Sequence, residues 1–288
     1  MALNKEIWEN QIMENFYPER SFLTRVKDFT AHVNANKLHI PSAGIDPKVL
    51  VNNNTYPIDV VGREDEDCEI SLEKFETENT LVRRPEAIEY SYEKLESVIS
   101  QHRNTLQTYT ARKAVHAFAP IQDSADTPLI YTSGEEFQGR RRLCANDILT
   151  LKERFDDALI PLENRWIVLS PKHVSDLLRE DLKLFKDITD LKNGEPFKFA
   201  GFGFYSFPYM PTYRGGNKVA YGAEHQAGDK FASVAFYGGE VMKADGDLHA
   251  YLLEDDPRER GTIVGFDKRF IAMPIRNKGI GAIISELT

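Results

Sequence analysis

One segment, Pro85–Ala119, most constrains the fold, because its pattern predicts a single helix that is too long for an ordinary compact domain. Apolar residues recur at steps of three and four along it, with one gap at His102. No glycine or proline lies between its ends, and a helix of this length spans about 50 Å at roughly 1.5 Å per residue. Two starts fit the sequence, since either Arg84 or Ser91 can be the capping residue.

The segment before this helix, Lys37–Val82, predicts a long polar β-arm. Strand-like stretches at Lys37–Ile40 and Cys68–Leu72 lie at its two ends, and turn-forming residues fill much of the middle. Its apolar side chains are too sparse to bury one another, and an isolated two-stranded ribbon is marginal in water. The arm must therefore pack on the rest of its own chain or on another subunit. Together with the long helix, it indicates a subunit that its neighbours complete.

The N-terminal residues carry a further short helical pattern. Apolar residues in Asn4–Tyr17 fall on one helix face, and Pro18 should end the helix. This helix either docks on the core of its own chain or forms an arm that packs on a neighbouring subunit. The sequence favours neither alternative.

The rest of the chain predicts an α/β unit followed by strands. The expected elements of that unit are helix Asn146–Leu159 with Asn146 as its cap, strand Trp166–Leu169, a helix that starts at Ser170-Pro171, and strand Phe197–Phe207. The expected later strands are Phe231–Tyr237, Leu248–Leu253, Thr262–Phe266, Arg269–Pro274 and Gly279–Ile284. Because the chain leaves one core near Ile121 and returns with strands near its C-terminal end, we expect the middle of the chain to be an inserted unit.

Composition excludes some function classes. The 288 residues include 36 Lys and Arg against 45 Asp and Glu, for a net charge of −9, so the chain as a whole does not attract nucleic acid. No apolar run approaches the ~20 residues of a membrane helix, and the first residues lack the apolar core of a signal peptide. The two cysteines, Cys68 and Cys144, are far apart and predict neither a disulfide framework nor a zinc site.

Motifs for catalysis are also missing from the sequence. The seven histidines show no metal-ligand spacing, and no complete dinucleotide, phosphate-loop or nucleophile-elbow motif occurs. We therefore expect no catalytic, cofactor-binding or metal residues, and a structural protein rather than an enzyme. The alternative from another class is an α/β enzyme with its site in the loops near Tyr213–His225.

Two charged clusters are candidates for contacts between subunits. The candidates are Glu64, Asp65, Glu66 and Asp67 in an acidic turn, and Arg140, Arg141 and Arg142 in a compact basic cluster. The basic cluster either pairs with the acidic turn of a neighbour, contacts DNA phosphates or is solvated surface. The acidic turn is otherwise a solvated turn.

Several runs resemble the major capsid proteins of tailed bacteriophages, which have the Hong Kong 97-type fold. They are Asn53–Pro57, Asn79–Arg83 with Ser91–Lys94, and Arg165–Pro171, and they are most similar to capsid proteins of phages of Bacteroidota. The order of the predicted parts matches the same family along nearly the whole chain. These runs support family membership rather than a particular site.

The resemblance implies an α+β fold with four parts. It implies an N-terminal arm over residues 1–36, an extended β-loop over 37–82 that lies on an adjacent subunit, and an α/β axial domain over 121–236. Residues 83–120 and 237–288 would form the peripheral domain, with the long helix as its spine.

The implied function is that of a major capsid protein, a subunit that self-assembles into hexamers and pentamers of an icosahedral head enclosing double-stranded DNA. The implied partners are other copies of the chain, together with portal and scaffold or decoration proteins. Packaged DNA would be near the protein without specific contact, and neither a cofactor nor a membrane is implied. The implied location is the virion, after assembly in the host cytoplasm. An encapsulin-type compartment shell shares the fold and is the alternative.

Overall fold

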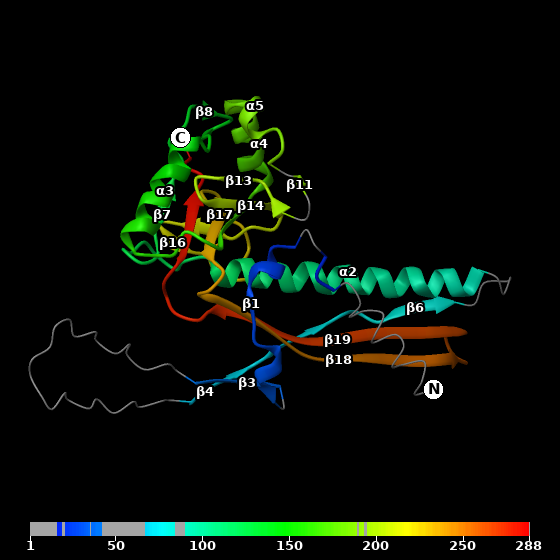
Figure 1. Ribbon diagram of the computed structural model, residues 1–288. Coiled ribbons are helices and arrows are strands. Elements are labelled where there is room, and N and C mark those ends of the chain that lie inside the picture. Colours follow the sequence, from blue (N-terminus) through cyan, green and yellow to red (C-terminus); the bar gives the residue numbers. More distant parts are fainter. Residues whose placement is uncertain are drawn as a thin grey trace, which may run out of the picture.

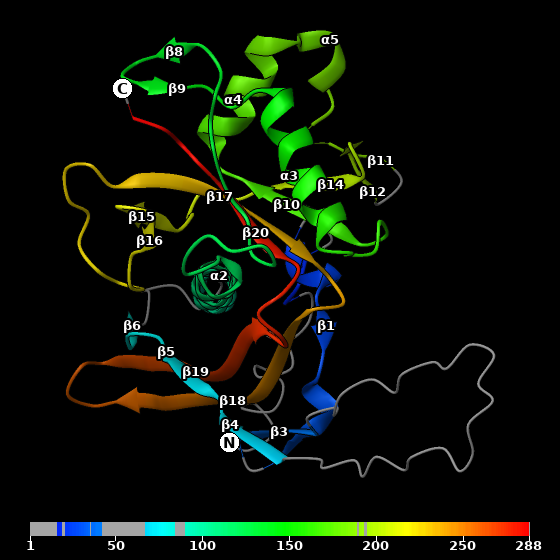
Figure 2. The same ribbon diagram turned by 90° about the vertical axis from the view of Figure 1, so that its left-hand side faces the viewer.

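A long helix, α2 (Tyr90–Phe118), lies between an upper α/β unit and a lower sheet in the computed structural model (Figure 1). The structure describes residues 16–18, 21–34, 36–41, 67–83, 90–188, 190–192 and 195–287. Figure 2 looks along α2 and shows the two units on opposite sides of it. The predicted long helix is confirmed over Tyr90–Phe118. Ser91 lies inside this helix rather than capping it, and residues 84–89 are outside the described residues.

The lower sheet is built on one antiparallel hairpin, β18 (Val241–Asp256) and β19 (Gly261–Pro274). The three strands that the sequence predicts here, Leu248–Leu253, Thr262–Phe266 and Arg269–Pro274, are confirmed as strand but with bounds that are too short. The observed strands run on through charged positions and bury Asp245 and Lys268 within the sheet. The remaining strands of this sheet are β1 (Lys27–Asp28), which pairs with β18, and β5 (Glu73–Glu76) and β6 (Thr80–Arg83), which both pair with β19.

The described parts of the predicted β-arm pack on their own chain. A small sheet joins β2 (Val33–Asn34), β3 (Lys37–Pro41) and β4 (Asp67–Ser71), which confirms the two predicted end strands. Leu38 and Leu72 are buried against the start of β18. The arm therefore leans on the lower sheet at its base, while its middle, residues 42–66, lies outside the described residues.

The two halves of α2 are buried by different partners. Ile99 and Leu106 pack on the hairpin, and His102 fills the gap between them with its ring 5.2 Å from that of Phe266. Toward the C-terminal end, Ala111, Ala114, Val115 and Phe118 enter the core of the upper unit. The predicted apolar stripe shifts along the helix because the helix changes partner.

The upper unit contains an eight-stranded sheet covered by short helices. Its main path is β13-β14-β10-β17-β15-β16, and its helices are α3 (Ala145–Asp157), α4 (Pro171–Glu180) and α5 (Leu182–Phe185). The strands are β7 (Leu129–Tyr131), β10 (Arg165–Leu169), β13 (Lys198–Phe199), β14 (Phe202–Ser206), β15 (Thr212–Arg214), β16 (Asn217–Lys218), β17 (Lys230–Tyr237) and β20 (Ile280–Ile284). Two small ribbons, β8 (Glu136–Phe137) with β9 (Arg140–Arg141) and β11 (Leu191–Lys192) with β12 (Glu195–Pro196), complete the unit. The predicted buried strand around Trp166–Leu169 is confirmed.

Two local predictions need correction. The expected strand Phe197–Phe207 is a hairpin, because Ala200 and Gly201 adopt positive φ and turn the chain between β13 and β14. Helix α3 is capped by Cys144 rather than Asn146, and the Asp147 carboxylate accepts a hydrogen bond of 3.0 Å from the Cys144 N–H.

The last strand of the chain, β20, lies in the upper sheet. It pairs with β17 in antiparallel and with β7 in parallel orientation. The division expected from the sequence puts residues 237–288 with α2, but this strand completes the sheet of the 121–236 unit. The hairpin β18–β19 is therefore the part of the C-terminal region that packs beneath α2.

Candidate functional site

The buried histidine of the upper unit, His173, is a structural link. Its Nδ1 lies 2.6 Å from Ser233 Oγ, and its Nε2 lies 2.8 Å from Ser285 Oγ. Burial lowers the pKa of His173 to about 4, so the ring is neutral and uses one nitrogen as donor and the other as acceptor. All three side chains are buried, so the cluster joins α4, β17 and the segment after β20 without being open to a substrate.

Arg140 of the predicted basic cluster is bound within its own chain. Its Nη1 and Nη2 donate to the two carboxylate oxygens of Asp176 on α4, at 2.6 and 2.8 Å. Asp176 is fully buried and also accepts a hydrogen bond of 3.2 Å from the Leu143 N–H. A two-bond pair of this kind fixes the β9 segment on α4 and leaves Arg140 little charge to offer a neighbour.

The other members of the two charged clusters are less engaged. Arg142 forms an ion pair with Glu135 at the surface, and Arg141 is exposed, with one long hydrogen bond of 3.4 Å to the Ser133 carbonyl. Glu64, Asp65 and Glu66 lie outside the described residues. Asp67 belongs to β4, but its side chain is not described. Contact between the two clusters therefore stays a prediction, with Arg141 as the exposed cation.

A charged cluster that the sequence reasoning missed fastens the N-terminal segment to the lower sheet. Lys268 Nζ lies 2.6 Å from Asp245 Oδ1, and the Tyr17 hydroxyl donates to the same carboxylate at 2.6–2.7 Å. Lys243 Nζ lies 3.4 Å from the centre of the Tyr17 ring and 3.6 Å from Asp28 Oδ2. Burial lowers the pKa of Lys243, and it raises the pKa of Tyr17 with help from Asp245. The sequence contains one signal for this cluster. Lys243 and Asp245 are two positions apart, so in a strand both side chains lie on the same face.

The C-terminal end of α2 is closed by residues of the β15–β16 hairpin. The Lys218 ammonium donates to the carbonyls of His116 and Ala119 at 3.1 and 2.6 Å, and the Tyr213 hydroxyl donates to the Pro120 carbonyl at 2.6 Å. Burial lowers the pKa of Lys218 to about 8. A cation at the last carbonyls satisfies them and offsets the negative end of the helix dipole.

The loops proposed for the alternative enzyme site form a narrow cleft against α2. Its volume is about 40 Å³, well below the roughly 300–1,000 Å³ of small-molecule sites. Its lining includes Arg112, His116, Tyr209, Tyr221 and His225, and contains no serine, cysteine or carboxylate among the described residues. Burial lowers the pKa of His116, whose Nε2 lies 2.8 Å from the Val219 carbonyl. The cleft therefore contains two imidazoles but, among the described residues that line it, no serine or cysteine nucleophile beside them.

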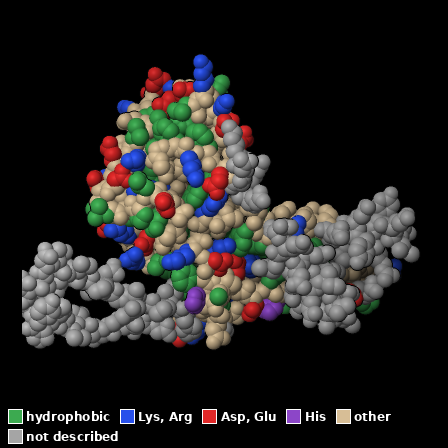
Figure 3. Space-filling model, viewed as in Figure 1, with side chains coloured by type: hydrophobic (Ala, Val, Ile, Leu, Met, Phe, Trp, Pro, Cys, Tyr) green, Lys and Arg blue, Asp and Glu red, His purple; other side chains and the backbone are tan. Residues whose placement is uncertain are grey.

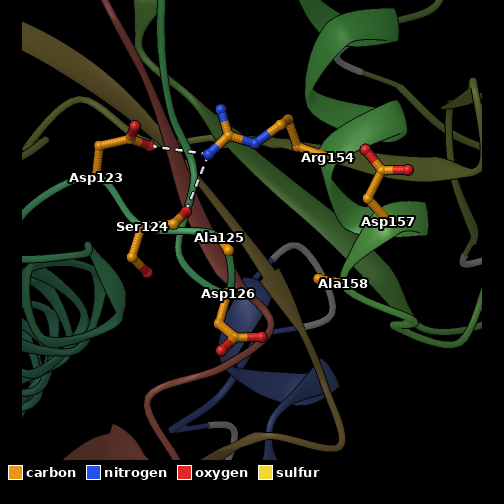
Figure 4. A pocket seen from close by; sticks show the side chains of 7 residues that line it. All are labelled: Asp123, Ser124, Ala125, Asp126, Arg154, Asp157 and Ala158. Atoms are coloured by element: carbon orange, nitrogen blue, oxygen red, sulfur yellow. Dashed lines mark hydrogen bonds and ion pairs between the residues drawn. The ribbon is translucent and has the colours of Figure 1, made fainter.

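A larger depression of about 410 Å³ lies between α3 and the loop after α2. Arg154 Nη2 donates to Asp123 Oδ1 at 3.2 Å and to the Ser124 carbonyl at 3.0 Å, while Asp126 and Asp157 line the other walls (Figure 4). Within the described ranges no group of histidine, cysteine and carboxylate side chains is arranged to hold a metal ion. The depression is therefore a polar surface feature, and Arg154 is the cationic side chain among its lining residues.

The outer surface mixes charge signs and exposed apolar groups. Figure 3 shows lysine, arginine and acidic side chains interspersed over the visible face of the upper unit, with hydrophobic side chains among them. Leu159 and Leu182 are 85% and 67% exposed, and single exposed apolar side chains of this kind are common on protein surfaces. None of the helices in the described part of the chain combines the length and apolar character that a membrane span requires.

Comparison with solved structures identifies the fold, although no family model and no curated protein matches the sequence. The capsid of Ralstonia phage GP4 is 9% identical with a TM-score of 0.61, and the match covers 92% of this chain and 87% of that one. The mature capsid of bacteriophage PhiM1 is 12% identical with a TM-score of 0.60, covering 92% and 86%. The virus-like particle from Pyrococcus furiosus is 9% identical with a TM-score of 0.58, covering 97% and 99%.

These likenesses establish the fold over about nine-tenths of the chain. The chain has the α+β, Hong Kong 97-type fold of phage capsid shells, as the sequence resemblance implies. The similarity to phages of Bacteroidota stays a prediction.

Proposed function

We propose that this chain is a major capsid protein, the subunit of an icosahedral phage head that encloses double-stranded DNA. The observation that carries the proposal is the capsid-type fold, which matches phage capsids over most of both chains. Hexamers and pentamers would form through head-to-tail contacts that close into rings. The role is structural, and the other implied partners are portal and scaffold or decoration proteins.

The charge and shape of the subunit support this role. A net charge of −9 limits adhesion to packaged DNA, so a shell can hold a genome without gripping it. The lower sheet and α2 project well beyond the upper unit, which gives each copy several separate surfaces for its neighbours (Figure 1). Many weak contacts then add through multivalency.

The proposed division into shell parts follows the sequence prediction with one change. Residues 1–36 are the N-terminal arm, 37–82 the extended loop, and α2 with β18–β19 the peripheral domain. The axial domain is 121–236 together with β20, because β20 completes its sheet.

Electron microscopy of the purified full chain tests the proposal. We expect closed particles with hexameric and pentameric capsomers, and we expect these particles to contain DNA when they are isolated from an infected host. A protein that stays monomeric under all assembly conditions and is absent from particles would contradict it.

An encapsulin-type compartment shell is the second candidate. The specific observation in its favour is the match to the Pyrococcus furiosus virus-like particle, which covers nearly all of both chains. The content of the particles separates the two functions, since a phage head holds DNA and a compartment shell holds protein cargo.

A further inference from the structure

The cleft at the C-terminal end of α2 contains an arginine whose guanidinium lies over two aromatic rings. Arg112 Cζ lies 5.8 Å from the centre of the Tyr209 ring and 5.5 Å from that of the Tyr221 ring. Lys113 Nζ lies over the Tyr221 ring at 4.7 Å. Cation–π attraction favours a guanidinium over a ring face and leaves its N–H groups available to a hydrogen-bond acceptor.

Arg112 has no acidic partner among the described residues, unlike several other arginines of the molecule. Arg140, Arg214 and Arg276 each bind a carboxylate of their own chain. Over the ranges that the structure describes, no carboxylate lies within 4 Å of Arg112, and its contacts are the two tyrosine rings. The charge of Arg112 is therefore not neutralised by a described carboxylate of its own chain.

The surroundings of Arg112 favour a small anion. The negative end of the α2 dipole is offset by Lys218, whose ammonium lies 2.6 Å from the Ala119 carbonyl oxygen. Lys113 adds a second cation beside the cleft, although Glu73 Oε1 lies 2.9 Å from its Nζ. The cavity of about 40 Å³ admits the end group of one side chain and is too small for a nucleotide.

We infer that this cleft binds a carboxylate side chain of a second copy of the chain. A guanidinium fork can hold a carboxylate through two parallel hydrogen bonds. Copies of this chain are the favoured source, because each carries 45 Asp and Glu and a net charge of −9. The inference rests on the proposed shell function, which brings copies together, and it names one contact in that assembly.

Assembly of matched variants of the full chain tests the contact. Arg112→Gln removes the charge, Arg112→Lys keeps the charge but not the planar fork, and Arg258→Gln is the control at an exposed arginine outside the cleft. Light scattering with electron microscopy measures the protein concentration at which particles form. We expect about a tenfold increase for Arg112→Gln, a smaller one for Arg112→Lys, and little change for Arg258→Gln. Urea unfolding of each unassembled variant separates an assembly defect from misfolding.

Zero-length carbodiimide cross-linking identifies the partner group. Particles made from mixed ¹⁴N- and ¹⁵N-labelled copies should yield a link from Lys113 to an acidic residue of another copy, weakened in Arg112→Gln. The Lys113–Glu73 link within one copy is the internal control.

Different outcomes separate the inference from the proposed function. The inference is overturned if Arg112→Gln forms particles at the same protein concentration as the wild type and Lys113 shows no cross-link to another copy. That result leaves the proposed shell function unaffected. Normal assembly with reduced DNA retention overturns it in favour of a phosphate ligand. Failure of the wild-type chain to form any particle overturns both.

Discussion

In the upper unit, the buried His173 is neutral and lies between two serine hydroxyls, whereas in the lower sheet two buried lysines face two aspartates. The cluster of His173, Ser233 and Ser285 is stable only while the His173 ring is neutral. The lysine–aspartate cluster of the lower sheet depends on its charges and on the hydrogen bond that the Tyr17 hydroxyl donates to Asp245. Acid should therefore weaken the upper unit first, and alkali should weaken the attachment of the N-terminal segment first.

The largest effect should come from breaking the ionic pair of the lower sheet. Lys268→Met leaves the Asp245 carboxylate buried without its ammonium partner, and we expect a loss of about 3–5 kcal/mol in the free energy of unfolding. Urea denaturation measures the loss, and hydrogen exchange should show it concentrated in β18, β19 and the N-terminal segment. The double variant Asp245→Asn with Lys268→Met should recover part of the stability. A loss of hydrogen-exchange protection that is spread evenly over both units would contradict the proposed difference between them.

The second effect is the acid sensitivity of the upper unit. The pKa of His173 is lowered from about 6.5 to about 4, so between these pH values the unfolded chain binds more protons than the folded one. Stability should fall as pH falls through this range, by about 3 kcal/mol at its lower end. The measurement is urea unfolding at several pH values for the wild type and for His173→Gln. The variant should be less stable at pH 7 but show a flatter dependence on pH, and an unchanged slope would show that other groups cause the acid response.

The smallest of the three effects concerns the Tyr17 hydroxyl. Tyr17→Phe keeps the ring beneath Lys243 but removes the hydrogen bond to Asp245, and we expect a loss of about 2 kcal/mol at neutral pH. Because the pKa of Tyr17 is raised in the folded state, wild-type stability should decline above pH ~10, where the unfolded chain loses the proton first. Limited proteolysis of the N-terminal segment across pH provides the readout. The variant should lack this alkaline decline; if both proteins respond alike, Tyr17 is not its source.

Much of the fold could be predicted from local patterns. The helix through Ile99 and Leu106, the strand around Trp166 and the start of α4 at Ser170 each carry a periodic or capping signal within a few residues. The failures occur where tertiary contacts decide the outcome. The strands β18 and β19 run through Asp245 and Lys268 because these side chains neutralise each other across the hairpin, a pairing that local sequence does not encode.

The candidate site residues could likewise be predicted only in part from the sequence. The sequence identifies Arg140, Arg141 and Arg142 as one cluster, yet the structure turns Arg140 inward to Asp176 and leaves Arg141 outside. Adjacent residues on a strand point to opposite faces, so a run of like charges is divided by its register. Arg112 was missed because its aromatic partners come from a loop about one hundred residues later in the chain.

The position of β20 has a consequence for when the subunit can become complete. This strand lies between β17 and β7, although it ends only a few residues before the chain does. During synthesis, β7 has no partner in the upper sheet until residues 280–284 have emerged, while α2 and the β18–β19 hairpin are already made. The upper unit is thus completed only after α2 and the β18–β19 hairpin have been synthesised, and its sheet depends on a strand made long after β7.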